Sequence, residues 1–180
     1  MPRYRWWLVV AFGLFAAGLV VGLLLPAGSD GGLLSSLEGM AGGVTPFAVS
    51  TVVFIYFKNA LAVLASFFFA PFLLLMPLVT LTLNGVILGL VGAMTVRNHS
   101  VGYLLAGVLP HGIIELSAVF IAEAAAFSFG LAVMTSLFKK ERRAELPGVF
   151  RQNLRWLWLS LVLLVPAAFI ETYVTPLLIR

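Results

Sequence analysis

The sequence predicts an all-α, polytopic membrane helix bundle of about five transmembrane helices, with one or two short re-entrant or interfacial helices. Of its 180 residues, 62% are hydrophobic and 10% charged, against about 45–50% and about 25% in soluble globular domains. The mean hydropathy is +1.10. Apolar runs of roughly 20 residues, long enough to cross a hydrocarbon core of about 30 Å as a helix, recur along the chain. We interpret residues 1–180 as a single integral membrane domain.

The first apolar run predicts a transmembrane helix over residues 6–25. Arg3, Arg5 and a Trp pair stand at its start, as at many membrane interfaces. A signal peptide would have an apolar centre of about 7–15 residues and a small-residue cleavage motif. This run is longer and no clear motif follows it, so we expect the helix to be retained. Residues 26–46 have no Lys or Arg and predict a non-cytoplasmic loop, with at most a short helix around 33–40.

The next apolar segment, residues 47–96, is too long for one crossing. The polar pair Lys58-Asn59 and the helix-breaking Pro77 divide it. This division predicts a short interfacial helix and two transmembrane helices, over residues 47–57, 59–76 and 78–96 respectively.

The segment 103–138 is also too long for a straight crossing at about 1.5 Å per residue. Pro110 is the expected break, because proline cannot donate the helical hydrogen bond. We expect a short re-entrant or surface helix before it and a fourth transmembrane helix over 112–137. A basic loop follows, and the fifth transmembrane helix is expected over 156–178.

The distribution of basic residues predicts the orientation. Cytoplasmic loops carry an excess of Lys and Arg, and the basic loop contains Lys139, Lys140, Arg142, Arg143, Arg151 and Arg155. With five crossings, a cytoplasmic basic loop also places the basic N-terminus in the cytoplasm and the C-terminus outside. We therefore expect a multi-pass protein of the cell membrane with this orientation.

Three ionisable side chains interrupt the fourth span. On a helix, His111 lies one turn from Glu115, and Glu123 lies eight residues further on, about 80° around the axis. Such groups cost about 2.5–3.5 kcal/mol at the bilayer centre and generally face the bundle interior or water. With Asn59 and Asn84 they form the candidate intramembrane polar site. Other candidate partners are Lys58, Thr80, Thr82 and Glu171, the last of which we expect to reach the membrane interface.

Three interpretations of this polar site remain open. In the first it is structural: His111 caps a loop, Glu115 pairs with a basic or Asn side chain, and Glu123 stays protonated. In the second, Glu115 and Glu123 relay protons or bind cations along a pathway. A metal or hydrolytic site is the third, but His-x-x-x-Glu supplies two ligands only, and no HExxH-type motif accompanies it. The sequence therefore predicts no metal, no cofactor and no catalytic residue.

Small residues at four-residue spacing predict close helix packing. They form two main series: Gly85 and Gly89 on the third span, and Ala118, Ala122, Ala126 and Gly130 on the fourth. Gly18 and Gly22 repeat the pattern on the first. These faces favour packing within the chain, with a homodimer as the alternative.

Several classes of function are disfavoured. The absence of Cys excludes a thiolate metal site and a cysteine nucleophile. No phosphate loop, dinucleotide fingerprint or catalytic serine motif occurs. The basic residues do not form a stripe with interleaved aromatics, so nucleic acid is not an expected partner. We expect a protein that is not an enzyme.

Two stretches resemble the stage II sporulation protein M family of integral membrane proteins. In residues 57–92 the resemblance lies in Asn59 and in Asn84-Gly85 followed by Gly89, and in residues 109–126 it lies in the Pro-His-Gly-x-x-Glu segment that begins at Pro110. It covers roughly residues 50–135. The resemblance implies a non-enzymatic membrane module that assembles with other membrane proteins. The alternative function is a small proton- or cation-coupled transporter or channel subunit that uses Glu115 and Glu123.

Overall fold

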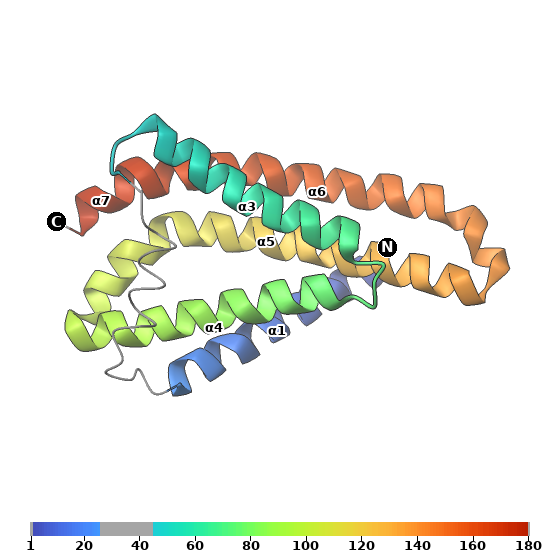
Figure 1. Cartoon of the computed structure of the whole chain (residues 1–180), viewed down its shortest axis with the longest axis horizontal. Helices are drawn as coiled ribbons and strands as arrows, with labels where there is room; N and C mark the ends of the chain where they lie inside the picture. The colour runs from blue at the N-terminus through green and yellow to red at the C-terminus, as the bar shows by residue number, and fades with distance from the viewer. Residues whose placement is uncertain (1, 26–44, 180) are drawn as a thin grey trace.

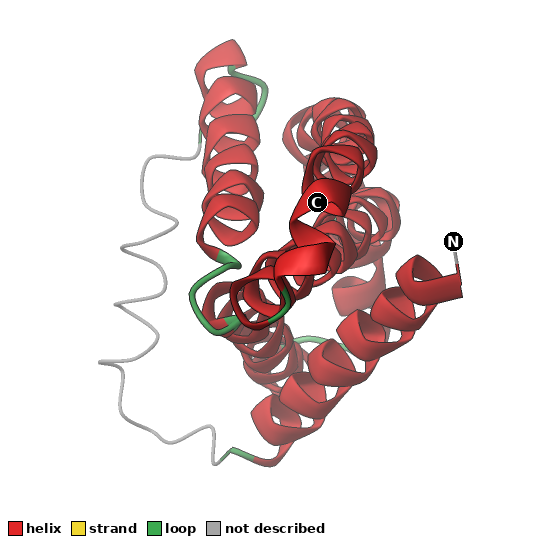
Figure 2. Ribbon diagram, turned by 90° about the vertical axis from the view of Figure 1, so that its right-hand side faces the viewer, coloured by secondary structure: helices red, strands yellow, loops and turns green. Residues whose placement is uncertain are grey.

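The computed structural model describes residues 2–25 and 45–179, and within these ranges it contains helices and short connections but no strand (Figures 1 and 2). The short helix expected around residues 33–40 lies outside the described residues. The elements are α1 (Pro2–Leu24), α3 (Val49–Phe69), α4 (Leu75–Asn98), α5 (Val101–Phe138), the 3₁₀ helix η1 (Lys140–Glu145), α6 (Leu146–Phe169), the π-helical turn η2 (Ile170–Val174) and α7 (Thr175–Leu178).

Among the described residues, five helical stretches are long and apolar enough to cross a membrane, which confirms the predicted all-α membrane bundle. They are Tyr4–Leu24, Val49–Phe69, Leu75–Asn98, Val101–Phe138 and Lys140–Leu178. The last includes η1, η2 and α7 besides α6. In Figure 1, η1 lies at one end of the bundle and α7 at the other.

The predicted boundaries of the second transmembrane helix are wrong. The expected interfacial helix 47–57 and the span beginning at 59 are one helix, α3, which continues through Lys58 and Asn59. A Lys side chain does not break a helix, because its long stem can carry the charge away from the apolar phase. The chain turns after α3 instead, where Leu73 and Leu74 have φ of 56° and 59°. Pro77 then lies in the first turn of α4, where a proline is tolerated.

The expected helix break at Pro110 is wrong, because the helix continues through this residue. α5 runs without a gap for 38 residues from Val101 to Phe138, with Pro110 inside it. The first part of α5 takes the place of the predicted re-entrant helix, and the helix changes direction between this part and the rest (Figure 1). Proline removes one helical hydrogen bond, and a membrane helix can absorb that loss as a kink.

The last span also begins earlier than predicted. α6 starts at Leu146, ten residues before 156, with Pro147 in its first turn. Proline favours that position because its missing N–H has no helical partner there. The basic residues Arg151 and Arg155 therefore lie on α6 rather than in a loop.

α5 lies at the centre of the bundle and contacts all four other long helices. Its small residues form the core: Ala118, Ala122 and Ala126 are at most 1% exposed, and Gly130 lies against the backbone of Ala70. Small side chains let the neighbouring helices approach closely. The alanine series is thus covered within a single chain.

α1 and α4 form the most extensive helix pair of the described chain. Gly18 and Gly22 of α1 face Gly85 and Gly89 of α4. A Cβ atom on Gly18 would overlap the carbonyl oxygen of Thr82, and a Cβ atom on any of the other three would likewise overlap a backbone oxygen of the facing helix. Only glycine permits this backbone-to-backbone contact.

We predict that Gly22→Leu lowers the midpoint temperature of unfolding in detergent, followed by circular dichroism. The added side chain would force α1 away from α4, and overpacking of this kind costs about 1–3 kcal/mol. Gly13→Leu on the same helix is the matched control, because a Cβ atom there meets nothing within 4 Å. Equal midpoints for the two variants would contradict the α1–α4 contact.

Candidate functional site

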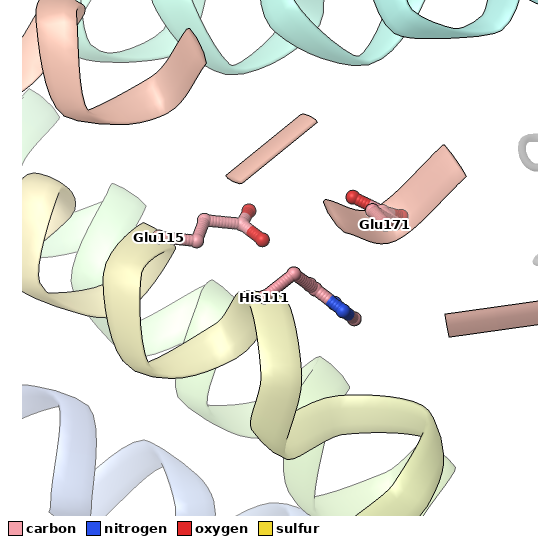
Figure 3. Close-up of side chains that lie close together, drawn as sticks. All are labelled: His111, Glu115 and Glu171. Carbon is pink, nitrogen blue, oxygen red and sulfur yellow. The ribbon is translucent and has the colours of Figure 1, made fainter. Parts of the chain in front are cut away.

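Three ionisable side chains from two elements converge near the α7 end of the bundle. His111 and Glu115 come from α5 and Glu171 from η2, and one possible ligand atom of each lies within 4.8 Å of the others. All three side chains are partly buried. Figure 3 shows His111 and Glu115 projecting from successive turns of α5, with a carboxylate oxygen of Glu171 turned toward Glu115. We call these three residues the His-Glu-Glu cluster.

Local sequence places the two α5 members of the cluster. His111 follows Pro110, and Glu115 is four residues later, so both lie on one face of the helix, one turn apart. The Nδ1 atom of His111 is 3.1 Å from the hydroxyl oxygen of Thr175 in α7. This hydrogen bond ties the imidazole to the end of the last span.

Glu171 enters the cluster from the π-helical turn. A π-helix has a wider turn than an α-helix, and such turns occur frequently at functional sites. Within the described part of the chain, no hydrogen-bond donor contacts the Glu171 carboxylate. We expected this residue to reach the interface, but its carboxylate instead lies beside His111 and Glu115.

A side chain of α3 fixes the position of the Glu115 carboxylate. The amide nitrogen of Asn59 donates a hydrogen bond of 2.9 Å to its Oε1 atom. The charge of the neighbouring Lys58 acts on both Glu115 and Glu171, although the Lys58 side chain itself is exposed. The predicted pairing of Glu115 with an Asn side chain is thus present, and a cation lies nearby.

Glu123 lies two turns deeper and is fully buried. The Ser66 hydroxyl donates a hydrogen bond to its Oε2 atom, while Oε1 has no partner among the described residues. Asn59 and Ser66 are seven residues apart on α3, close to the eight that separate Glu115 from Glu123. Two hydrogen bonds at successive depths therefore join α3 to α5.

Asn84 is not brought to this site. Its side chain is exposed, and its amide donates a hydrogen bond of 2.8 Å to the carbonyl oxygen of Thr80 within α4. The neighbouring Gly85 is buried against α1. Because consecutive helical residues point about 100° apart, a glycine face turned to α1 leaves Asn84 on another side of the helix.

Sequence reasoning missed two members of the polar network, Ser66 and Thr175. The sequence carries a weak signal for Ser66, because its seven-residue spacing from Asn59 is close to the eight residues between the two glutamates on α5. Thr175 has no comparable signal, since the π-helical turn that precedes it changes the angular position of every later residue.

These features define a class: a helical membrane protein that crosses the bilayer several times and holds carboxyl groups between its helices. The chain belongs to the stage II sporulation protein M family, because the sequence pattern of that family matches residues 10–176. No solved structure matches the chain.

One curated relative is the uncharacterized protein MJ0793 of Methanocaldococcus jannaschii. The two are 34% identical over 99 residues, which is 54% of this chain and 56% of the relative. The chain thus spans about half the length of that relative. The name of the relative gives no activity.

We predict that Ser66→Ala lowers the free energy of unfolding in detergent by about 1–3 kcal/mol, because a buried carboxyl group would lose its hydrogen-bond donor. Chemical denaturation followed by circular dichroism measures this change. Ser117→Ala is the matched control, since the exposed Ser117 hydroxyl bonds only to its own helix, at the carbonyl of Ile113. A Ser66 variant as stable as the Ser117 variant would rule out a stabilising role for the α3–α5 hydrogen bond.

Proposed function

We propose that this protein is a non-enzymatic, multi-pass module of the cell membrane that works within a larger assembly of membrane proteins. The observation that carries the proposal is the pairing of both α5 carboxyl groups with hydrogen-bond donors of α3, from Asn59 to Glu115 and from Ser66 to Glu123. Polar groups paired in this way fix the relative position of helices. Membership of the stage II sporulation protein M family supports the same proposal.

The alternative, a proton or cation pathway, has less support from the geometry. A pathway needs carboxyl groups that water or an ion can reach. Glu123 is fully buried, and two cavities at the basic end of the bundle are lined by neither Glu115 nor Glu123. We therefore assign the buried carboxyls to the architecture of the module.

The proposed orientation places the N-terminus in the cytoplasm and the C-terminus outside. The basic residues of η1 and of the first turns of α6 lie at one end of the bundle, and Arg97 lies at the end of α4 beside the opposite turn. Cytoplasmic segments carry such an excess of Lys and Arg.

Single cysteines test this orientation, because the chain has none of its own. We predict that Asn98→Cys reacts with a membrane-impermeant maleimide in intact cells, while Ala144→Cys reacts only after the cells are opened. Both positions are exposed, so access to the reagent alone decides the result. The reverse pattern would invert the proposed topology.

A groove on α6 is the surface through which we propose that a partner is contacted. It has a volume of about 540 Å³. Trp156, which forms one wall, is held in place by stacking on Tyr4, with ring centroids 4.8 Å apart. Its lining residues are Gly148, Arg151, Gln152, Arg155, Trp156 and Leu159. Two arginines one turn apart favour an acidic segment of a neighbouring membrane protein.

We predict that the tagged protein, extracted from its native membrane in mild detergent, elutes with a membrane-protein partner in constant ratio. Arg151→Glu combined with Arg155→Glu should release most of that partner, because both charges that attract it are reversed. Lys139→Glu with Lys140→Glu changes the charge equally outside the groove and should retain it. Elution of the unaltered chain as a free monomer would contradict the proposed assembly.

A further inference from the structure

We propose that the His-Glu-Glu cluster binds one divalent transition-metal ion of the Zn²⁺ type and so joins α5 to the π-helical turn η2. This site goes beyond the proposed function and does not depend on it. It also revises the expectation that His-x-x-x-Glu offers too few ligands, because Glu171 supplies a third ligand from a distant part of the chain.

The donor set selects the class of ion. One imidazole nitrogen and two carboxylate oxygens suit Zn²⁺ and the neighbouring first-row metals. Mg²⁺ and Ca²⁺ favour sites built of oxygen ligands only. Three protein ligands are also the number found in zinc sites that keep a fourth position for water or another small ligand.

The distances are compatible with a single ion. Metal bonds of about 2.0–2.2 Å at tetrahedral angles place neighbouring ligand atoms about 3.4 Å apart. The three ligand atoms already lie within 4.8 Å of one another, so changes in side-chain torsion angles are enough to close the remaining distance. Small rotations of Glu115 and Glu171 toward His111 would complete the site without movement of the backbone.

Neighbouring groups orient the ligands as they do around known metal sites, where a second hydrogen bond fixes each ligating side chain. Asn59 bonds to the Oε1 atom of Glu115 and leaves Oε2 available. Thr175 bonds to Nδ1 of His111, and when Nδ1 carries the proton the lone pair of Nε2 is available for an ion. Glu171, which has no donor among the described residues, keeps both oxygens available.

The charges at the cluster favour a bound cation. Two carboxylates this close repel each other, and partial burial strengthens the repulsion because the local dielectric constant is low. Lys58 contributes one positive charge, from an exposed side chain. A divalent ion between the two carboxylates would remove the repulsion. A single proton shared between Glu115 and Glu171 is the competing solution, which the experiment below separates from a metal.

Zinc binding is measured on the full chain in detergent micelles, purified with a tag that contains no histidine and stripped of metal with a chelator. We expect Zn²⁺ alone to bind at about one ion per chain by calorimetry and by elemental analysis after gel filtration. Background binding is low because the chain has two histidines and no cysteine. His111→Gln and Glu171→Gln should each weaken binding at least tenfold, since each removes one of three ligands.

Two matched variants serve as controls. His99→Gln removes the other histidine, which stacks on Tyr103 at the turn between α4 and α5, and Glu123→Gln removes a carboxylate of the same helix. Both should bind Zn²⁺ like the unaltered chain. X-ray absorption of the unaltered chain loaded with zinc should show only nitrogen and oxygen ligands, including one imidazole, and this measurement needs no folded variant.

Three results would overturn the proposal. The first is the absence of stoichiometric Zn²⁺ binding by the unaltered chain. The second is binding that survives in both His111→Gln and Glu171→Gln. The third is a proton shared between the carboxylates in place of a metal. In that case Zn²⁺ would leave the unfolding midpoint unchanged, and Glu171→Gln would raise it.

Discussion

A carboxyl group placed between helices in a bilayer needs a hydrogen-bond donor within the protein, because lipid offers none. α5 carries two such groups at successive depths, and α3 meets both, with Asn59 opposite Glu115 and Ser66 opposite Glu123. Two matched pairs fix the rotation of α5 about its axis as well as its height relative to α3. Once that rotation is set, the alanine series of α5 lies in the centre of the bundle, and His111 lies toward the last span.

The remaining helices follow from this placement by a different kind of contact. α1 and α4 meet backbone to backbone through four glycines, so their association depends on shape and van der Waals contact rather than on polar pairing. α6 follows α5 through the short helix η1 and packs along it. The bundle thus combines a polar junction, which specifies orientation, with glycine and alanine surfaces, which supply close packing.

Hydropathy and helical periodicity predicted much of this arrangement. The number of crossing segments follows from apolar length, and the common face of His111 and Glu115 follows from their four-residue spacing. The predicted start of this span is wrong because the polar pair Lys58-Asn59 does not end the helix α3: the flexible lysine stem carries its charge outward, and Asn59 bonds to Glu115 of α5. The position of Glu171 could not be foreseen, because it depends on the packing of the last span beside α5 and on the π-helical turn in which Glu171 lies. Pairing between distant helices, as for Ser66, is a tertiary property that periodicity alone does not encode.

The glycine contact between α1 and α4 has a consequence for biosynthesis. α1 is synthesised before its partner α4, and α3 is made between them. Gly22 and Gly89 are 67 residues apart (89 − 22), a distance that takes about 3 to 13 seconds to synthesise at the usual 5–20 residues per second. During that interval the glycine face of the newly inserted α1 is open to lipid or to any other helix nearby. α1 therefore depends on later-made sequence for its partner, and the close glycine contact can form only after α4 has been synthesised.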